Sequence, residues 1–588
     1  MLSRLLQGVL IAGFSLWYAV AEEEKASHTD MATAATVLGM ISFVMVLYYF
    51  LLFPDQDVRQ YSYEALSSTI SIFCAVLSFQ ALDNFLEIMI LDHLPLTLKV
   101  CFDMCHMLFW FLTLQATLAW LSGAVGTTWA VKELSPADEL DEAKVKKYEK
   151  EESLRERNMK CFGILLAHIS GFAAINAFGS MQQMFPFSSN AWLSFLAIPI
   201  AVLVLYILFH SMNIIRTKVS HGDDGEIDET EKLWDEETEE AENDVFGLAV
   251  SFLLVQSLRF LICGNLADEE GEEEAEVLLG HGAVQTLLLY IFGLLFVGVI
   301  FALIFNEKEE EEEAGDEEKP KEEGAGGKQE EEEGNPEDRS FEEAQLVAMT
   351  MGFSWAMFYG SRWLLAGTVI GSDPMVLALC VALSISIVSM LTIIPLDFLA
   401  DQDFTGDKTD KAIIQTIRGL GILIGFAWEQ CFDAAVGSLA SGFGHAAGTV
   451  KLGMAIFVVS IIVPAWHMYI LPYMIEQGWK TGFVVEDAVK NLIDDGAVAN
   501  LKGKDKDKDL DRTKKVFSAC KKRLANHGAK EFLASEGYTL LPAEDSAAKK
   551  EVDTLKRKFS EHVEGSLKHS QAMMDRLAKI QAKLPTTA

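Results

Sequence analysis

Apolar and polar stretches alternate along the chain on a scale much longer than the repeat of a soluble helix or strand. Eleven stretches are nearly free of charge, and segments rich in Glu, Asp and Lys separate them. About 20 apolar residues cross a bilayer core, where backbone polar groups must bond within their own segment. Each stretch therefore predicts a transmembrane helix. The eleven spans lie near residues 32–53, 64–91, 96–126, 160–180, 191–213, 245–264, 282–305, 344–366, 374–399, 411–437 and 450–475.

A short motif recurs in five of these spans. In each copy a Gly or Ser precedes a Phe, and an aromatic residue or Leu follows that Phe by six positions. The copies are SFQALDNFLE (78–87), GFAAINAFGS (171–180), SFLLVQSLRF (251–260), GFSWAMFYGS (352–361) and GFAWEQCFDA (425–434). We call the helices that carry them the motif helices, and the spans that follow them the return helices. The pattern predicts an all-α polytopic membrane protein, one leading helix followed by five tandem hairpins near 64–126, 160–213, 245–305, 344–399 and 411–475.

Two columns of the aligned motifs carry physical information. The residue before the Phe and the residue four positions earlier are small in all five copies, as in Gly421 and Gly425. In lipid, such small-xxx-small stripes favour close helix packing. The residue four positions after the Phe is polar in four copies, namely Asp83, Asn176, Gln256 and Gln430. These side chains form either interhelical hydrogen bonds or the lining of a polar path.

The last motif helix places two acids in an apolar segment. Glu429 and Asp433 follow Gly421 and Gly425 at i, i+4 spacing, so all four share one helix face. A carboxylate at the bilayer centre costs about 2.5–3.5 kcal/mol on insertion scales, so such residues face the protein interior or water. We predict that they bind a cation or proton, and that Asp83 and Glu87 in the first motif helix contribute.

Two arginines are candidate counter-ions for these acids. Arg259 occupies the column of Asp433 in the third motif helix, and Arg362 follows that column by two positions in the fourth. A closed ion pair would be structural, whereas a carboxylate left partly unpaired would attract a cation or carry a proton. The sequence leaves these two outcomes open.

The ends and linkers define the remaining regions. Residues 1–21 have a basic start, an apolar core and an Ala-Val-Ala cleavage site, which predicts a signal peptide; an uncleaved helix is the alternative. The transmembrane domain covers 22–475, interrupted by an acidic low-complexity cytosolic linker at 306–343. Lys and Arg gather in the linkers between hairpins, which predicts a cytosolic C-terminus and an extracytosolic N-terminus. The acidic connector 266–277 is expected to be a solvated surface loop.

The tail, residues 476–588, is predicted to be soluble and helical. Apolar residues recur every three or four positions over 549–584, which predicts an amphipathic or coiled-coil helix. This helix either packs on the protein's own cytosolic face or binds a protein partner, including a second copy.

Charge and motifs limit the functional classes. The formal net charge of −37 and the lack of a basic patch argue against nucleic-acid binding. The sequence has no nucleotide, protease or hydrolase motif and no metal-ligand spacing, so we expect neither an enzyme nor a cofactor. Two interpretations remain for a membrane protein of the secretory pathway: a channel or carrier for cations or protons, and a non-transporting scaffold whose tail binds partners.

Overall fold

The computed structural model describes residues 28–89, 95–125, 142–220, 229–306, 336–368, 373–402, 404–475, 498–500 and 538–540. The chain divides into two compact units, residues 1–476 and 477–588. In the second unit the strands β1 (Val498–Asn500) and β2 (Tyr538–Leu540) pair antiparallel, with Ala499 opposite Thr539. The predicted signal peptide, the helix over 549–584 and most of the acidic linker lie outside the described residues.

The described part of the first unit is almost entirely helical. The leading helix is α2 (His28–Leu51). The motif helices are α3 (Gln56–Met89), α5 (Glu142–Gln182), α8 (Glu229–Cys263), α11 (Pro336–Ala366) and α13 (Asp407–Ser441). The return helices are α4 (Leu96–Ser122), α7 (Ala197–Ser220), α10 (Ala283–Asn306), α12 (Pro374–Ala400) and α14 (Ala447–Ala465), which continues into the π-helical turn η5 (Trp466–Ile470). The short elements are η2 (Phe187–Ser189), α6 (Ala191–Ser194), α9 (Ala275–Leu279) and η4 (Gly444–Ala446).

Within the described residues, nine helices are long and apolar enough to cross a membrane. The leading helix contributes a shorter apolar segment, Leu38–Leu51, and α11 is not among the nine. The helices are therefore compatible with a multi-pass membrane protein. Eleven crossings, the tandem hairpin repeat and the orientation of the ends remain predictions.

Two motif helices extend well beyond their apolar spans. The helix α5 begins at Glu142 and α8 at Glu229, in segments that the charge pattern assigned to linkers. These segments are rich in Glu, Lys and Arg, which are good helix formers. Oppositely charged pairs one turn apart support them, such as Lys147 with Glu151 and Lys232 with Glu236, each at 3.6 Å. The charge pattern therefore did not predict that the apolar helices continue into these charged segments.

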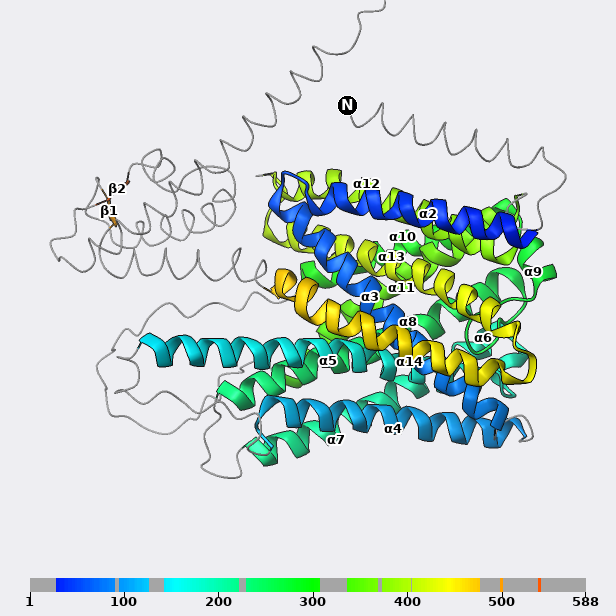
Figure 1. The fold of residues 1–588 in the computed structure, drawn as a ribbon, viewed down its shortest axis with the longest axis horizontal. Helices are drawn as coiled ribbons and strands as arrows, with labels where there is room; N and C mark the ends of the chain where they lie inside the picture. Colours follow the sequence, from blue (N-terminus) through cyan, green and yellow to red (C-terminus); the bar gives the residue numbers. More distant parts are fainter. Residues whose placement is uncertain are drawn as a thin grey trace, which may run out of the picture. The chain divides into compact units, whose positions relative to one another are not determined.

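The motif helices form a closed ring. Each packs against two others, in the order α3, α5, α8, α11, α13 and back to α3. Each return helix packs mainly on the motif helix of the following hairpin: α4 on α5, α7 on α8, α10 on α11, α12 on α13, and α14 on α3. Figure 1 shows α14 beside α3, although α3 belongs to the first hairpin and α14 to the last. The last return helix thus closes the circle on the first motif helix.

Glycines allow the ring helices to approach closely. A Cβ atom added at Gly425 of α13 would lie 2.8 Å from the Ile72 side chain of α3, and one added at Gly247 of α8 would lie 2.6 Å from Val347 of α11. Gly171 of α5 faces Leu248 of α8 equally tightly. The small residues therefore lie at contacts between ring neighbours, as close packing in lipid requires.

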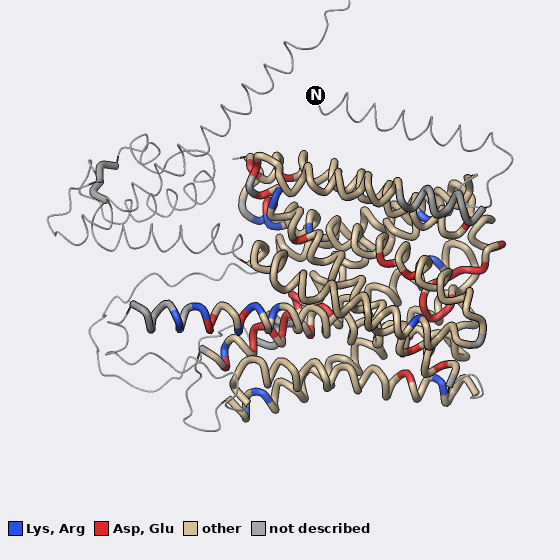
Figure 2. Tube along the Cα trace, in the orientation of Figure 1, with Lys and Arg blue, Asp and Glu red and all other residues tan. Residues whose placement is uncertain are grey.

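Charge and aromatic residues are layered along the helices. Figure 2 shows acidic and basic residues mostly toward the two ends of the helices, with a largely uncharged middle. Phe252, Trp355 and Phe426, from the ring neighbours α8, α11 and α13, are buried together; the Trp355 and Phe426 rings stack at 3.8 Å. Phe252 and Phe426 are the phenylalanines of the motif. This aromatic layer lies one turn before Gln256 and Gln430.

Candidate functional site

The connector between α8 and α9, residues 264–274, folds over the end of the ring. Gly264 and Gly271 have φ values of 78° and 82°, a region that favours glycine. Between them the Asp268 carboxylate accepts hydrogen bonds from the backbone N–H groups of Glu270 and Glu272, at 3.1 and 2.7 Å. This turn gives the acidic loop a defined shape. Asp268, Glu270, Glu272 and Glu274 are exposed, as expected for a surface loop, whereas Ala267 and Gly271 are buried.

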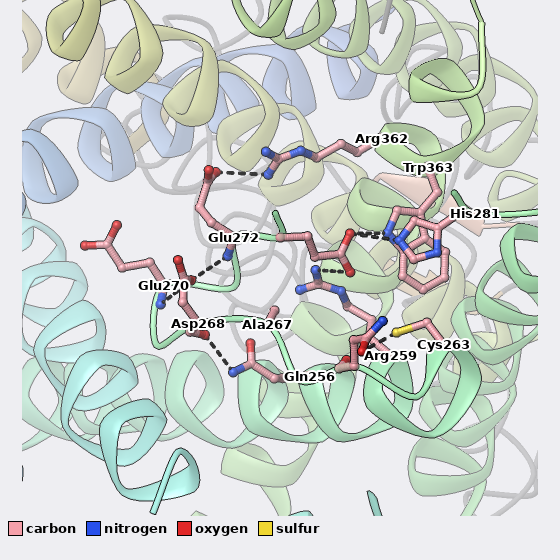
Figure 3. A network of polar contacts seen from close by, with 12 residues as sticks. Gln256, Arg259, Cys263, Ala267, Asp268, Glu270, Glu272, His281, Arg362 and Trp363 are labelled. Atoms are coloured by element: carbon pink, nitrogen blue, oxygen red, sulfur yellow. Dashed lines mark hydrogen bonds and ion pairs between the residues drawn. The ribbon is translucent and has the colours of Figure 1, made fainter. Parts of the chain in front are cut away.

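Two amide side chains from the ring hold the connector by its backbone. Gln256 of α8 donates to the carbonyl of Asp268 at 2.9 Å (Figure 3). Gln183, just after α5, donates to the carbonyl of Ala267 at 2.6 Å. A Cβ added at Gly179 of α5 would lie 2.6 Å from the carbonyl oxygen of Glu269. The loop therefore lies directly against α5 and α8.

A buried ion pair anchors the connector to the ring. Arg259 of α8 lies 2.8 Å from the Glu273 carboxylate, and the two side chains are 2% and 5% exposed. The other oxygen of Glu273 is 3.0 Å from His281 and accepts a 2.9 Å hydrogen bond from Trp363 of α11 (Figure 3). The Arg259 guanidinium also lies 3.6 Å from the ring centre of Tyr359, a cation–π contact.

The environment of Glu273 keeps it ionised. Burial alone would raise the pKa of this carboxyl, but the hydrogen bond with His281 and the charge of Arg259 outweigh burial and lower the pKa to about 2. A carboxylate with such partners is a structural anchor, since its charge is compensated on two sides.

Two further ion pairs tie the loop to other helices. Arg362 of α11 lies 3.0 Å from Glu272. Lys99 of α4 bridges Glu87 of α3 at 2.8 Å and Glu269 of the connector at 3.0 Å. The connector is thus bonded to α4, α8 and α11, and Lys99 links it to Glu87 of α3.

Glu270 differs from the other acids of the connector. In Figure 3 its side chain points away from the ion pairs of Glu272 and from the Arg259 cluster. Burial raises its pKa to about 8; Asp433, Asp268 and Asp83 act in the same direction, and Lys451 opposes them. The residue itself is exposed, so water reaches this carboxyl despite the surrounding acids.

Glu429 lies deeper in the bundle, at 1% exposure. One carboxylate oxygen accepts a 3.1 Å hydrogen bond from Gln430, and the other has no hydrogen-bond partner in the described part of the chain. The charged groups that act on it are Asp433, Glu270 and Glu272, all of them acids. One turn further along α13, Asp433 pairs with Lys451 of α14 at 3.0 Å.

Asp83 of α3 completes the acidic cluster from the opposite side of the site. It accepts a 3.2 Å hydrogen bond from Asn176 of α5. Its other oxygen lies 3.3 Å from Nδ1 of His106, whose Nε2 accepts a 2.9 Å hydrogen bond from Trp110. Because Trp110 donates to Nε2, a neutral His106 carries its proton on Nδ1. Neither Nδ1 nor the nearby Asp83 oxygen has a hydrogen bond within the described residues. Asp103 of α4 is buried beside Asp83.

The structure separates the sequence-predicted residues into two groups. Arg259 and Arg362 bind acids of the connector, and the partner of Asp433 is Lys451. Of the two outcomes that the sequence left open, the structure therefore shows no pairing of these arginines with Glu429 or Asp433. Glu87 binds Lys99, and Gln256 binds backbone. Gln430 and Asp433 lie beside Glu429, while Asp83, which binds Asn176, is connected to this group through the field at Glu270.

Several residues of the candidate site were not predicted from the sequence. Asp103 and Lys451 are isolated charges in apolar spans, and this signal was present in the sequence. Glu270 and Glu273 belong to one acidic run, in which no local pattern distinguishes a buried anchor from an exposed acid. Only the folded connector separates their roles.

Comparisons of the chain with protein-family models, with curated proteins and with solved structures find no match in any of the three. The fold and the site therefore define the class of protein no further than a helical protein compatible with multiple membrane crossings.

Proposed function

We propose that this chain is a membrane transport protein, a channel or carrier for protons or cations, whose binding site is the acidic cluster of Glu429, Asp433, Glu270 and Asp83. Its ion pathway follows the interior of the motif-helix ring, with Asn176, Gln256 and Gln430 as polar lining. The N-terminus is extracytosolic and the C-terminus cytosolic, so the connector covers the extracytosolic end.

One observation carries this proposal. Glu429 is almost completely buried, one of its oxygens is unpartnered within the described residues, and its charged neighbours are all acids. Burying an uncompensated carboxylate is costly, so the group must hold a proton or a bound cation. A site that must be occupied by a small positive ion is the expected feature of an ion-translocating protein.

The aromatic layer supports the view that the proposed ion pathway is closed in this structure. Phe252, Trp355 and Phe426 fill the space between three ring helices next to the polar column, and all are buried. An ion that reaches Glu429 from the connector end meets this apolar barrier. Transport therefore requires a rearrangement of the ring, as in alternating access or hydrophobic gating.

Reconstitution in proteoliposomes tests the proposal. We expect the wild-type protein to carry a flux of protons or monovalent cations under an imposed gradient, and Glu429→Gln to abolish most of it. Glu276→Gln, which removes one exposed acid beside the connector, is the matched control and should leave the flux unchanged. Equal fluxes in wild-type, Glu429→Gln and empty vesicles would contradict the proposal.

A scaffold function is the second candidate. Four basic residues each form an ion pair with an acid, namely Arg259, Arg362, Lys99 and Lys451. These pairs support a scaffold function, because paired charges can serve as interhelical contacts alone. In that case Glu429→Gln changes the stability of the bundle, no variant conducts ions, and partner binding depends on the tail 476–588.

A further inference from the structure

A second acidic site lies at the other end of α3. Asp55 lies in the turn between α2 and α3, Asp57 in the first turn of α3, and Asp397 in the last turn of α12. One carboxylate oxygen from each lies within 4.8 Å of the other two. The connector site adjoins Glu87 near the opposite end of α3, so the two acidic sites are separated by the length of the bundle.

The local structure holds these acids together. The carboxylate of Asp55 accepts the backbone N–H of Asp57 at 3.0 Å, which fixes the turn after the leading helix. The helix α12 packs against α2, and also against α3, and brings Asp397 to the same place. Three negative charges are thereby placed together by rigid helices and a defined turn.

Asp397 is the most buried of the three acids. It is 6% exposed, and its carboxylate has no hydrogen bond or ion pair within the described residues. The charged groups that act on it are Asp55, Asp401 and Asp57, all acids. A buried, ionised carboxylate without a donor or cation, within 4.8 Å of two further carboxylates, is strongly disfavoured unless the cluster takes up a proton or a positive ion.

We propose that Asp55, Asp57 and Asp397 bind one hard divalent cation, Ca²⁺ or Mg²⁺. Carboxylate oxygens alone favour these ions over Zn²⁺ or Cu²⁺, which prefer nitrogen and sulfur ligands. Water or backbone carbonyls complete the coordination. The ion connects the α2–α3 turn to the end of α12, and α12 packs on α13, the helix that carries Glu429. This site does not depend on the transport proposal.

The proposal is tested on the full-length protein in detergent after treatment with a chelator. Thermal unfolding and calorimetric titration are measured with CaCl₂ and with MgCl₂ in separate experiments. In a third experiment, the electron paramagnetic resonance spectrum of added Mn²⁺ reports an oxygen-ligated ion directly. We expect a saturable rise in Tm and binding of one ion per chain. Asp57→Asn and Asp397→Asn should each weaken binding by about tenfold or more, because even outer-shell changes have effects of that size.

Glu64→Gln is the matched control. It removes the same charge two turns further along α3, where Glu64 accepts a hydrogen bond from Gln60, and it should leave cation affinity unchanged. If Asp397→Asn does not fold, Asp57→Asn in the partly exposed turn still decides the question. The proposal is overturned if millimolar Ca²⁺, Mg²⁺ and Mn²⁺ do not bind the wild-type chain, or if both Asp variants bind as the wild type does. A Tm that responds to pH through Asp397 but not to any divalent ion would identify a protonated acid and overturn it as well.

Discussion

Arg259 on α8 and Glu273 in the connector lie 2.8 Å apart, with side chains 2% and 5% exposed. The same carboxylate is bonded to His281 and to Trp363 of α11. One buried acid therefore joins the connector to two neighbouring helices of the ring. Removal of either charge should loosen the loop that covers the acidic cluster.

We expect Glu273→Leu to lower the free energy of unfolding by about 3–5 kcal/mol, because it leaves the Arg259 charge buried without its partner. The double variant Arg259→Leu, Glu273→Leu removes both charges and should lose less than the single variant. Denaturant unfolding of the wild type, Glu273→Leu, Arg259→Leu and the double variant in one detergent gives the coupling energy between the two positions. Additive effects would show that the ion pair contributes no coupling.

The low pKa of Glu273 makes stability fall in acid. Its pKa is about 2 in the folded chain, against 4.5 for the free group, so the unfolded chain binds more protons between these values. The contribution of the Glu273 carboxylate to the free energy of unfolding is complete above pH 4.5 and is lost as the pH falls through 4.5 toward 2. The difference in unfolding free energy between wild type and Glu273→Gln should therefore shrink across this window. A difference that stays constant would contradict the assignment.

Glu270 should have the opposite effect on how stability depends on pH. Its pKa of about 8 lies above the free value of 4.5, so the folded chain binds more protons between these values and stability falls as the pH rises through that window. Glu270→Gln should match the wild type near pH 4 and exceed it in Tm at pH 9. Glu276→Gln controls for net charge and should show no such gain. The site also predicts that proton release from Glu270 at alkaline pH changes ion flux.

Gly425 tests the packing of the ring. A Cβ added there would lie 2.8 Å from the Ile72 side chain, so Gly425→Ala should force α13 away from α3 and cost about 1–3 kcal/mol. Gly437 of the same helix has open space around its added Cβ, and Gly437→Ala should be neutral or stabilise the helix by up to about 1 kcal/mol. Thermal unfolding of both variants provides the comparison. Equal behaviour at the two positions would show that the close approach is not required.

Hydropathy placed the helices well, because a stretch such as 282–305 has few alternatives to a helix in lipid. It did not reveal that each return helix packs on the next motif helix, since contacts between helices distant in sequence leave no local pattern. Glu429 and Asp433 stood out as isolated charges, but their neighbours depend on the connector. The shape of that loop follows from Gly264, Gly271 and the turn at Asp268, which composition alone describes only as an acidic run.

The aromatic layer offers the most direct test of a path through the ring. Phe426 is fully buried and stacks on Trp355 at 3.8 Å, so Phe426→Ala opens a cavity beside Glu429 at a cost of about 3–5 kcal/mol. If this layer closes the path, the variant should conduct ions faster than the wild type in proteoliposomes. Phe111→Ala in α4 removes an equally buried ring outside the motif helices and should lose stability without a gain in flux. Because both substitutions create cavities of similar size, a gain confined to Phe426→Ala assigns the barrier to the ring interior. The same gain in both variants would indicate leakage from a loosened bundle and would contradict the gate.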